Sequence, residues 1–150
     1  MKFNLIWVGK TRNRNWKTLQ QEYLRRLSHF VKVEITEVKD AVGPAAVKLE
    51  GNAILDRLNP SAFVTLLDVK GRNLSSHELA TEVEGWRNRG VREVAFIIGG
   101  ADGVSSEVAE RADLALSLSF LTFTHEMARV VLLEQLYRAF TIIKGFSYQK

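Results

Sequence analysis

Cysteine is absent from this 150-residue sequence, and histidine occurs only three times. Without cysteine the chain can form neither disulfide bonds nor thiolate metal sites. The three histidines, His29, His77 and His125, are too far apart for the ligand spacing that zinc usually requires. We therefore expect no metal site and no disulfide scaffold.

Long apolar runs are also missing. The apolar run at residues 1–8 is too short for a membrane span or a signal peptide, and no small-residue cleavage site follows it. We expect residues 3–8 to form a buried strand instead. The sequence thus predicts a cytoplasmic protein that does not bind membranes.

Neither sign of charge dominates strongly, since the formal net charge is only +4. A surplus of this size favours a polyanionic partner only weakly. The positions of the positive residues are more informative, because many of them lie in or just before the first expected helix with few acids between them. These residues are Lys10, Arg12, Arg14, Lys17, Arg25 and Arg26. They predict one basic face, which suits nucleic acid.

Short apolar runs alternate with apolar residues at helical spacing along the chain. The expected strands cover residues 3–8, 31–38, 62–68, 94–98 and 114–118. The expected helices cover about residues 16–27, 44–58, 76–88 and 126–143, with a shorter one that begins at Ser105 or Ser106. This order predicts a single α/β domain over residues 1–150, with a mainly parallel sheet and helices on both faces. In such folds ligands bind beyond the carboxyl ends of the strands.

Glycine is concentrated after the expected strand at 94–98, where Gly99, Gly100 and Gly103 stand close together. Glycines at this place let the backbone approach a ligand and leave amide groups available to it. A simple turn explains the pattern equally well. Known nucleotide motifs are absent, because Gly9-Lys10-Thr11 lacks the earlier glycine of a P-loop and no G-x-G-x-x-G follows the first strand.

Other residues permit both a functional and a structural interpretation. Asp68 is the last residue of the expected strand at 62–68, where an aspartate can bind ligand hydroxyls but more often caps a turn. His125 and Arg129 lie one turn apart in the last helix, so we expect their side chains to point the same way. A lone histidine at a helix start is most often a surface residue or a cap. No serine lies in a G-x-S-x-G elbow, which argues against a hydrolase.

Considered together, these segments resemble the ribosomal RNA large-subunit methyltransferase H family, which belongs to the SPOUT class. The likeness extends from the first strand to the last residues and is most specific in the C-terminal part. It rests on Tyr23-Leu24-Arg25-Arg26, Leu67-Asp68 with Gly71, Ile98-Gly99-Gly100 with Gly103, Leu116 to Phe123, His125, Arg129, Val130 to Ala139, and Ile143-Lys144-Gly145 with Tyr148.

This resemblance implies a deep trefoil knot over about residues 67–150, an exception to the usual absence of knots. It also implies that the three loops after the third, fourth and fifth strands hold S-adenosylmethionine at the interface of a homodimer. The implied reaction is methylation of N3 of a pseudouridine in 23S rRNA of the assembled ribosome, without a metal. We expect the dimer interface to involve the long last helix, whose apolar residues cover more than one face.

The resemblance also implies the site residues. The cofactor would contact Leu67, Gly99, Gly100, Gly103, Leu118, Ser119, Phe120, Leu121, Thr122, Phe123 and Thr124. The implied catalytic residues are Arg129, His125 and Tyr148. Arg129 would orient a phosphate or stabilise the deprotonated base, whereas His125 or Tyr148 would help to remove the proton.

The sequence departs from the family pattern at two places. Gln149 stands where relatives have histidine, and glutamine cannot take a proton at neutral pH. Thr124 replaces a frequent proline, which should alter loop stiffness more than chemistry. Two alternatives follow: a ribosome-binding SPOUT protein with weak or no activity, and a SPOUT methyltransferase that acts on tRNA. The short chain favours a large preformed substrate over tRNA.

Overall fold

A computed structural model describes residues 1–149, and its strands form one sheet with the order β2-β1-β4-β3-β5. Every neighbouring pair in this sheet is parallel. The strands are β1 (Lys2–Val8), β2 (Lys32–Val38), β3 (Phe63–Asn73), β4 (Glu93–Ile98) and β5 (Leu114–Ser117). The predicted α/β class with a parallel sheet is confirmed.

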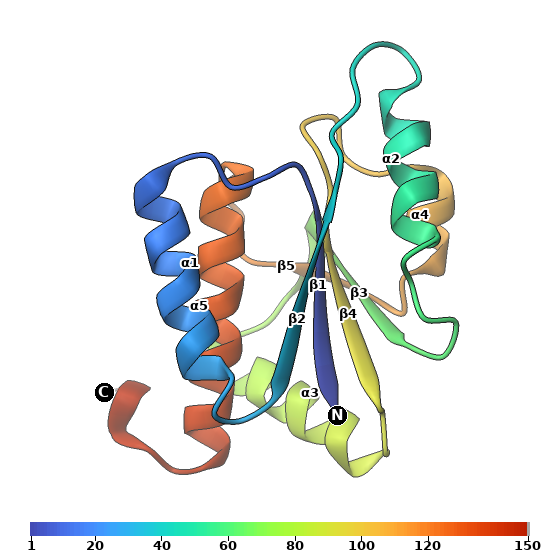
Figure 1. The fold of residues 1–150 in the computed structure, drawn as a ribbon. Coiled ribbons are helices and arrows are strands. Elements are labelled where there is room, and N and C mark those ends of the chain that lie inside the picture. The colour runs from blue at the N-terminus through green and yellow to red at the C-terminus, as the bar shows by residue number, and fades with distance from the viewer. Residues whose placement is uncertain (150) are drawn as a thin grey trace.

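Helices cover both faces of the sheet (Figure 1). The helices are α1 (Arg14–Leu27), α2 (Ala46–Leu55), α3 (Ser76–Asn88), α4 (Ser106–Arg111) and α5 (His125–Ile143), and a short 3-10 turn spans Ser147–Gln149. Helices α1, α3 and α5 pack on one face, and α2 and α4 lie on the other (Figure 1). The sheet is therefore the middle layer of three.

The two core clusters explain why β1 and β4 have continuous apolar sequences. Leu5 and Trp7 of β1 belong to the cluster under α1, α3 and α5, whereas Ile6 and Val8 belong to the cluster under α2 and α4. Successive residues of a strand point to opposite faces, so a strand covered on both sides needs apolar residues at every position.

Hydrogen-bonding side chains begin the helices where the sequence suggested. Ser75 caps α3, directly before the expected helix, and its capping box with Glu78 is complete. Ser105, not Ser106, caps α4, and Thr124 caps α5 through the amide of Met127. These caps fix the points at which the chain leaves the sheet and enters each helix.

Two predicted boundaries were wrong. Helix α2 is shorter than the expected 44–58, because it begins at Ala46 and ends at Leu55. Strand β3 extends to Asn73 rather than ending at Asp68. Its extension arises because Leu116 of β5 pairs both with Leu67 and, after an irregularity in the register, with Arg72. This pairing joins segments that are distant in sequence, so local pattern does not reveal it.

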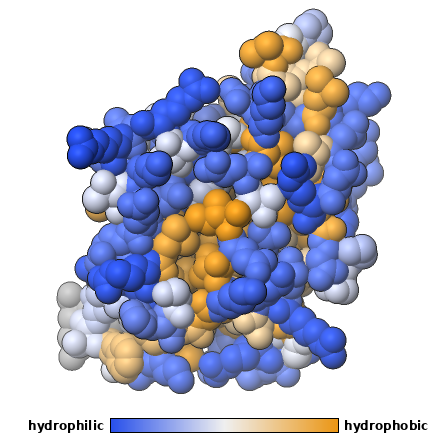
Figure 2. All heavy atoms as spheres, viewed as in Figure 1, coloured by the Kyte–Doolittle hydropathy of each residue, from blue (hydrophilic) through white to orange (hydrophobic). Residues whose placement is uncertain are grey.

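The surface on the side of α1 is mainly hydrophilic (Figure 2). Apolar atoms gather in the middle of this face and again around the loop before α2 (Figure 2). Val42 of this loop and Leu49 of α2 are exposed. In the part of the chain that the structure describes, no helix is both long and apolar enough to cross a membrane.

Candidate active site

A cleft with a volume of about 340 Å³ opens at the carboxyl ends of β3, β4 and β5. Its size suits a small-molecule site. The lining residues are Leu66, Leu67, Asp68, Val69, Ile98, Gly99, Gly100, Ala101, Gly103, Val104, Leu116, Leu118, Ser119, Leu121, Thr122, Phe123, His125 and Ala128. Most of them are apolar, and the polar ones come from three separate loops. The walls of the cleft are therefore mainly apolar, with a few polar groups among them.

The loop after β4 is a tight turn that only glycine permits. The amide of Gly103 donates to the carbonyl oxygen of Gly100 at 3.1 Å, and Gly103 has a φ of 83°. A Cβ on Gly99 would lie 2.7 Å from Val104 Cγ1 and 3.0 Å from the carbonyl oxygen of Gly103. Side chains here would force the turn open, so the glycines shape the cleft as the sequence pattern suggested.

Glu50 of α2 lies behind this loop, and sequence reasoning did not single it out. It is buried, and its Oε1 accepts from the amide of Ala41 at 2.9 Å. Its Oε2 would lie 2.8 Å from a Cβ on Gly100. Glu50 thus binds the loop after β2 and lies close to Gly100 of the glycine loop. A glutamate within an amphipathic helix gives no signal of such a role.

Asp68 has the capping role that the sequence favoured, and it also lies at the cleft. Its Oδ1 accepts from the amide of Lys70 at 2.9 Å, so the side chain caps the bend at the end of the regular part of β3. Asp68 also lines the cleft together with Val69. Neither was among the predicted cofactor contacts, although the position after a buried strand was a usable signal.

The loop between β5 and α5 divides into residues that face the cleft and residues that do not. Ser119 Oγ accepts from the amide of Leu121 at 3.0 Å and so shapes this loop. Two residues predicted as cofactor contacts are absent from the lining, Phe120 and Thr124. Phe120 is 86 % exposed, and Thr124 is the N-cap of α5. The other predicted cofactor contacts all line the cleft.

His125 lines the cleft, but Arg129 does not. The Arg129 side chain is only 2 % exposed and donates to the carbonyl oxygen of Val8 at 2.6 Å and to Thr11 Oγ1 at 2.9 Å. Its guanidinium lies over the Trp7 ring, 4.9 Å from the ring centroid. Burial lowers the pKa of Arg129 from its ordinary value. Arg129 is thus directed toward β1 and the loop after it.

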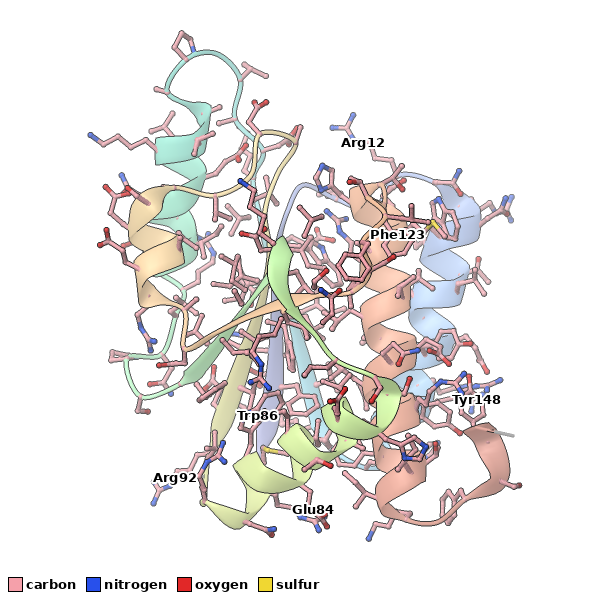
Figure 3. All side chains as sticks on the ribbon, turned by 180° about the vertical axis from the view of Figure 1, so that it is seen from behind. Arg12, Glu84, Trp86, Arg92, Phe123 and Tyr148 are labelled. Carbon is pink, nitrogen blue, oxygen red and sulfur yellow. The ribbon has the colours of Figure 1, made fainter. Side chains whose placement is uncertain are left out.

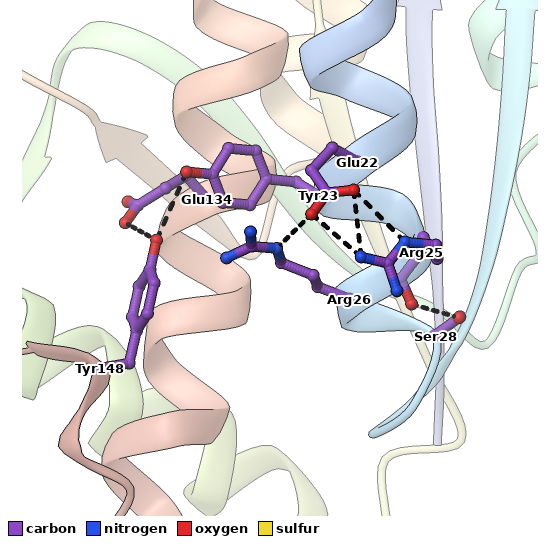
Figure 4. A network of polar contacts seen from close by, with 7 residues as sticks. All are labelled: Glu22, Tyr23, Arg25, Arg26, Ser28, Glu134 and Tyr148. Carbon is purple, nitrogen blue, oxygen red and sulfur yellow. Dashed lines mark hydrogen bonds and ion pairs between the residues drawn. The ribbon is translucent and has the colours of Figure 1, made fainter.

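Tyr148 lies in the 3-10 turn that follows α5, whereas the cleft lies at the start of α5. Figure 3 labels Phe123 in the upper half of the molecule and Tyr148 in the lower half. The Tyr148 hydroxyl donates to Glu134 Oε1 at 3.1 Å and lies 3.4 Å from the Tyr23 hydroxyl (Figure 4). Burial, the Tyr23 contact and the Glu134 charge raise the pKa of Tyr148. Within one chain, His125 therefore lies at the cleft, whereas Tyr148 lies outside it.

No metal ion has an obvious place in the cleft. Within residues 1–149, no three or more histidine, aspartate or glutamate side chains gather closely enough to hold one. The polar groups that line the cleft come mainly from serine, threonine, backbone amides and single titratable side chains.

The fold and the cleft define a three-layer α/β protein with a ligand site beyond the carboxyl ends of its parallel strands. A model described as "Predicted SPOUT methyltransferase" matches residues 1–149. The chain belongs to the SPOUT methyltransferase family, and the resemblance described above is confirmed.

Two relatives are similar over their whole length. "Ribosomal RNA large subunit methyltransferase H" of Desulfotalea psychrophila is 44% identical over 153 residues, with 100% of both chains covered. The protein of the same name from Carboxydothermus hydrogenoformans is 43% identical over 159 residues, again with 100% of both chains covered.

Solved structures share the fold at low sequence identity. A protein of the methylase family from Neisseria gonorrhoeae has a TM-score of 0.56 and 13% identity, and the match covers 91% of this chain and 81% of that one. TrmJ from Z. mobilis has a TM-score of 0.53 and 13% identity, with 91% and 69% covered. These matches confirm the fold and carry no information on substrate.

Proposed function

We propose that this protein transfers a methyl group from S-adenosylmethionine to N3 of a pseudouridine in 23S rRNA of the assembled ribosome. The proposal takes its substrate from the resemblance and from the names of the relatives. It takes its site from the cleft. The observation that carries it is the convergence of three loops, distant in sequence, on one cleft that nearly all the predicted cofactor contacts line.

The cleft fits the cofactor chemically. Leu67, Leu118 and Phe123 provide apolar walls on which a flat purine ring can pack. Gly99 and Gly103 bring backbone amides and carbonyls close enough to bind ring edges or hydroxyls. Asp68 adds a carboxylate at the rim, suited to a ribose hydroxyl or an amino group.

When bound, S-adenosylmethionine supplies an electrophilic methyl group on a sulfonium centre. The protein must hold N3 of the base in line with that methyl group and accept the proton that N3 loses. His125 is the only histidine that lines the cleft, and a neutral imidazole can accept this proton. Arg129 contributes indirectly, because its contacts with Val8 and Thr11 fix the loop beside the cleft.

The proposed active form is a homodimer. Phe120 and Leu121 are 86 % and 73 % exposed beside the cleft, and large exposed apolar side chains of this kind favour an interface. A second copy would cover them. It would also be the source of any Tyr148 that acts in the chemistry, because Tyr148 of the same chain is held at Glu134. We place this dimer in the cytoplasm, where ribosomes are found.

The first test is calorimetric titration of S-adenosylmethionine into the purified protein. Saturable binding is expected, and Gly100→Arg should abolish it by placing a long side chain at the cleft wall. Thr81→Arg adds the same charge on the exposed side of α3 and serves as the matched control. Absence of binding by the unmodified protein would contradict the proposal.

The second test uses tritiated cofactor and ribosomes from a strain that lacks this methylation. Label in 23S rRNA at N3 of the pseudouridine is the expected result. Label in tRNA instead would identify the tRNA-directed alternative. Ribosome binding without transfer would identify the inactive alternative that Gln149 suggests.

A further inference from the structure

Four positive residues gather in the loop after β1 and in the first turn of α1. They are Lys10, Arg12, Arg14 and Lys17, and we call them the basic surface. All four are exposed. We infer that the basic surface contacts RNA phosphates beside the cleft, and that Glu126 holds it in place. This inference rests on the proposed function, because it assigns the part of the chain that meets the RNA.

The charges of the basic surface are available to a partner. Within residues 1–149, Arg12 is the only one of these four residues with an ion pair, which it forms with Asp40 at 3.8 Å. The two side chains are 81% and 56% exposed, so water and salt weaken this pair. The first turn of α1 also contains no acid. A partner that binds here therefore does not need to displace strong internal ion pairs.

The position of the basic surface suits a substrate that reaches into the cleft. Figure 3 labels Arg12 and Phe123 in the same, upper half of the molecule, whereas Arg92 lies near the opposite end. Phe123 lines the cleft. A base held in the cleft would thus have its flanking phosphates on the side of Arg12.

The arrangement favours a polymer with repeated charges over a single small anion. Arg14 and Lys17 are three residues apart in α1 and lie on the same side of the helix. Lys10 and Arg12 precede them in the loop, so exposed cations recur every two or three residues from Lys10 to Lys17. Such a series of exposed cations is suited to the phosphate backbone of RNA.

Helix α5 fixes this loop from behind. One carboxylate oxygen of Glu126 accepts from the amides of Arg12 and Asn13, the latter at 3.1 Å. One turn further along, Arg129 binds the carbonyl oxygen of Val8 and the hydroxyl of Thr11. Both residues directly follow the segment that lines the cleft. The basic surface is thereby held in register with the cofactor site.

The experiment measures KM and kcat for ribosome methylation over a range of salt concentrations. For the double variant Lys10→Ala/Arg12→Ala, KM should rise about tenfold, and the slope of log KM against log salt should fall by about 1.4. The dissociation constant for S-adenosylmethionine should not change. Arg89→Ala/Arg92→Ala removes the same charge and should leave both quantities unchanged, because Arg89 follows the last turn of α3 and Figure 3 labels Arg92 at the end of the molecule opposite to Arg12.

The role of Glu126 has a test in which positioning and charge predict opposite signs. Removing a negative charge near RNA should by itself lower KM. If Glu126 positions the loop, Glu126→Ala should instead raise KM at least threefold with kcat largely kept, whereas Glu126→Gln, which keeps an acceptor oxygen, should restore the KM. A lowered KM in Glu126→Ala would overturn this role.

The inference and the proposed function can fail separately. If the unmodified protein binds S-adenosylmethionine but methylates no ribosome, the proposed function is wrong, and cosedimentation of the same variants with ribosomes decides the basic surface. If the unmodified protein is active and the double variant keeps its KM and salt slope, the inference is wrong. An equal effect of the control pair would also overturn it.

Discussion

Gly71 of β3 lies directly against Ala115 of β5. A Cβ on Gly71 would be 2.6 Å from the carbonyl carbon of Ala115 and 2.7 Å from its oxygen. These are backbone atoms, which cannot swing aside as a side chain can. This close contact between Gly71 and Ala115 lies where β3 resumes its pairing with β5, beside Leu116 of the cleft. Any side chain at position 71 must therefore move a cleft-forming strand.

We predict that Gly71→Ala destabilises the fold by about 2 kcal/mol, the usual cost of overpacking a tight site. Urea unfolding measures this effect. Gly85→Ala in α3 is the matched control, because its added Cβ would meet only the flexible end of Arg89. That change should be neutral or stabilise by up to about 1 kcal/mol, since alanine favours helices over glycine. Equal stability of both variants would contradict the close approach.

The contact between β3 and β5 also shows which features of the fold the sequence could predict and which it could not. Apolar runs and capping serines located most strands and helices, because both signals are local. The extension of β3 through Arg72 depends on pairing with β5, which lies far along the chain. The polar residues and glycine after Asp68 resemble a turn when read alone. The knot implied by the resemblance stays a prediction.

Prediction of the site had a similar limit. The loops that form the cleft were identified through the family resemblance, because the glycines after a buried strand fitted a simple turn equally well when read alone. Which way each side chain points was not predictable. His125 and Arg129 have helical spacing, yet one lines the cleft and the other reaches toward Val8. A long arginine side chain can reach partners that cannot be predicted from the position of its Cα atom.

Phe120 and Phe123 provide a direct test of the cleft. Phe123 lines it, whereas Phe120 is exposed and absent from the lining. We predict that Phe123→Ala weakens S-adenosylmethionine binding about tenfold through lost apolar contact. Phe120→Ala should leave cofactor affinity nearly unchanged in calorimetry. Because the proposed dimer covers Phe120, the same variant should have a larger dimer dissociation constant in analytical ultracentrifugation.

The contacts of Tyr148 with Tyr23 and Glu134 predict that the protein loses stability at alkaline pH. Its pKa is raised above the ordinary 10.0, first by burial and then by Tyr23 and the charge of Glu134. Folding thus favours the protonated phenol. The resulting stability is fully present below pH 10 and is lost as pH rises through the higher folded-state value.

The measurement is a spectroscopic titration of tyrosinate in the unmodified protein and in Tyr148→Phe. The difference between the two curves should show one tyrosine that ionises above pH 10. A difference curve centred at or below that value would mean that the contact with Glu134 does not persist in solution. Glu134→Gln removes the nearby charge and should lower the pKa of Tyr148.

Arg129 is buried, yet it has no carboxylate partner within salt-bridge distance among residues 1–149. Its planar guanidinium makes two hydrogen bonds and lies over Trp7, a combination that lysine cannot reproduce. We predict that Arg129→Lys costs about 2 kcal/mol in urea unfolding. Arg57→Lys, at an exposed position in the turn after α2, should cost less than about 0.5 kcal/mol.

The two possible roles of Arg129 also separate in kinetics. If it only positions the loop after β1, Arg129→Lys should raise KM for ribosomes and leave kcat and cofactor affinity close to normal, because Val8 and Thr11 lie outside the cleft lining. If it stabilises the reacting base, kcat should fall by about 100-fold or more. The guanidinium lies over Trp7, and Arg129 is absent from the cleft lining, which favours the first result.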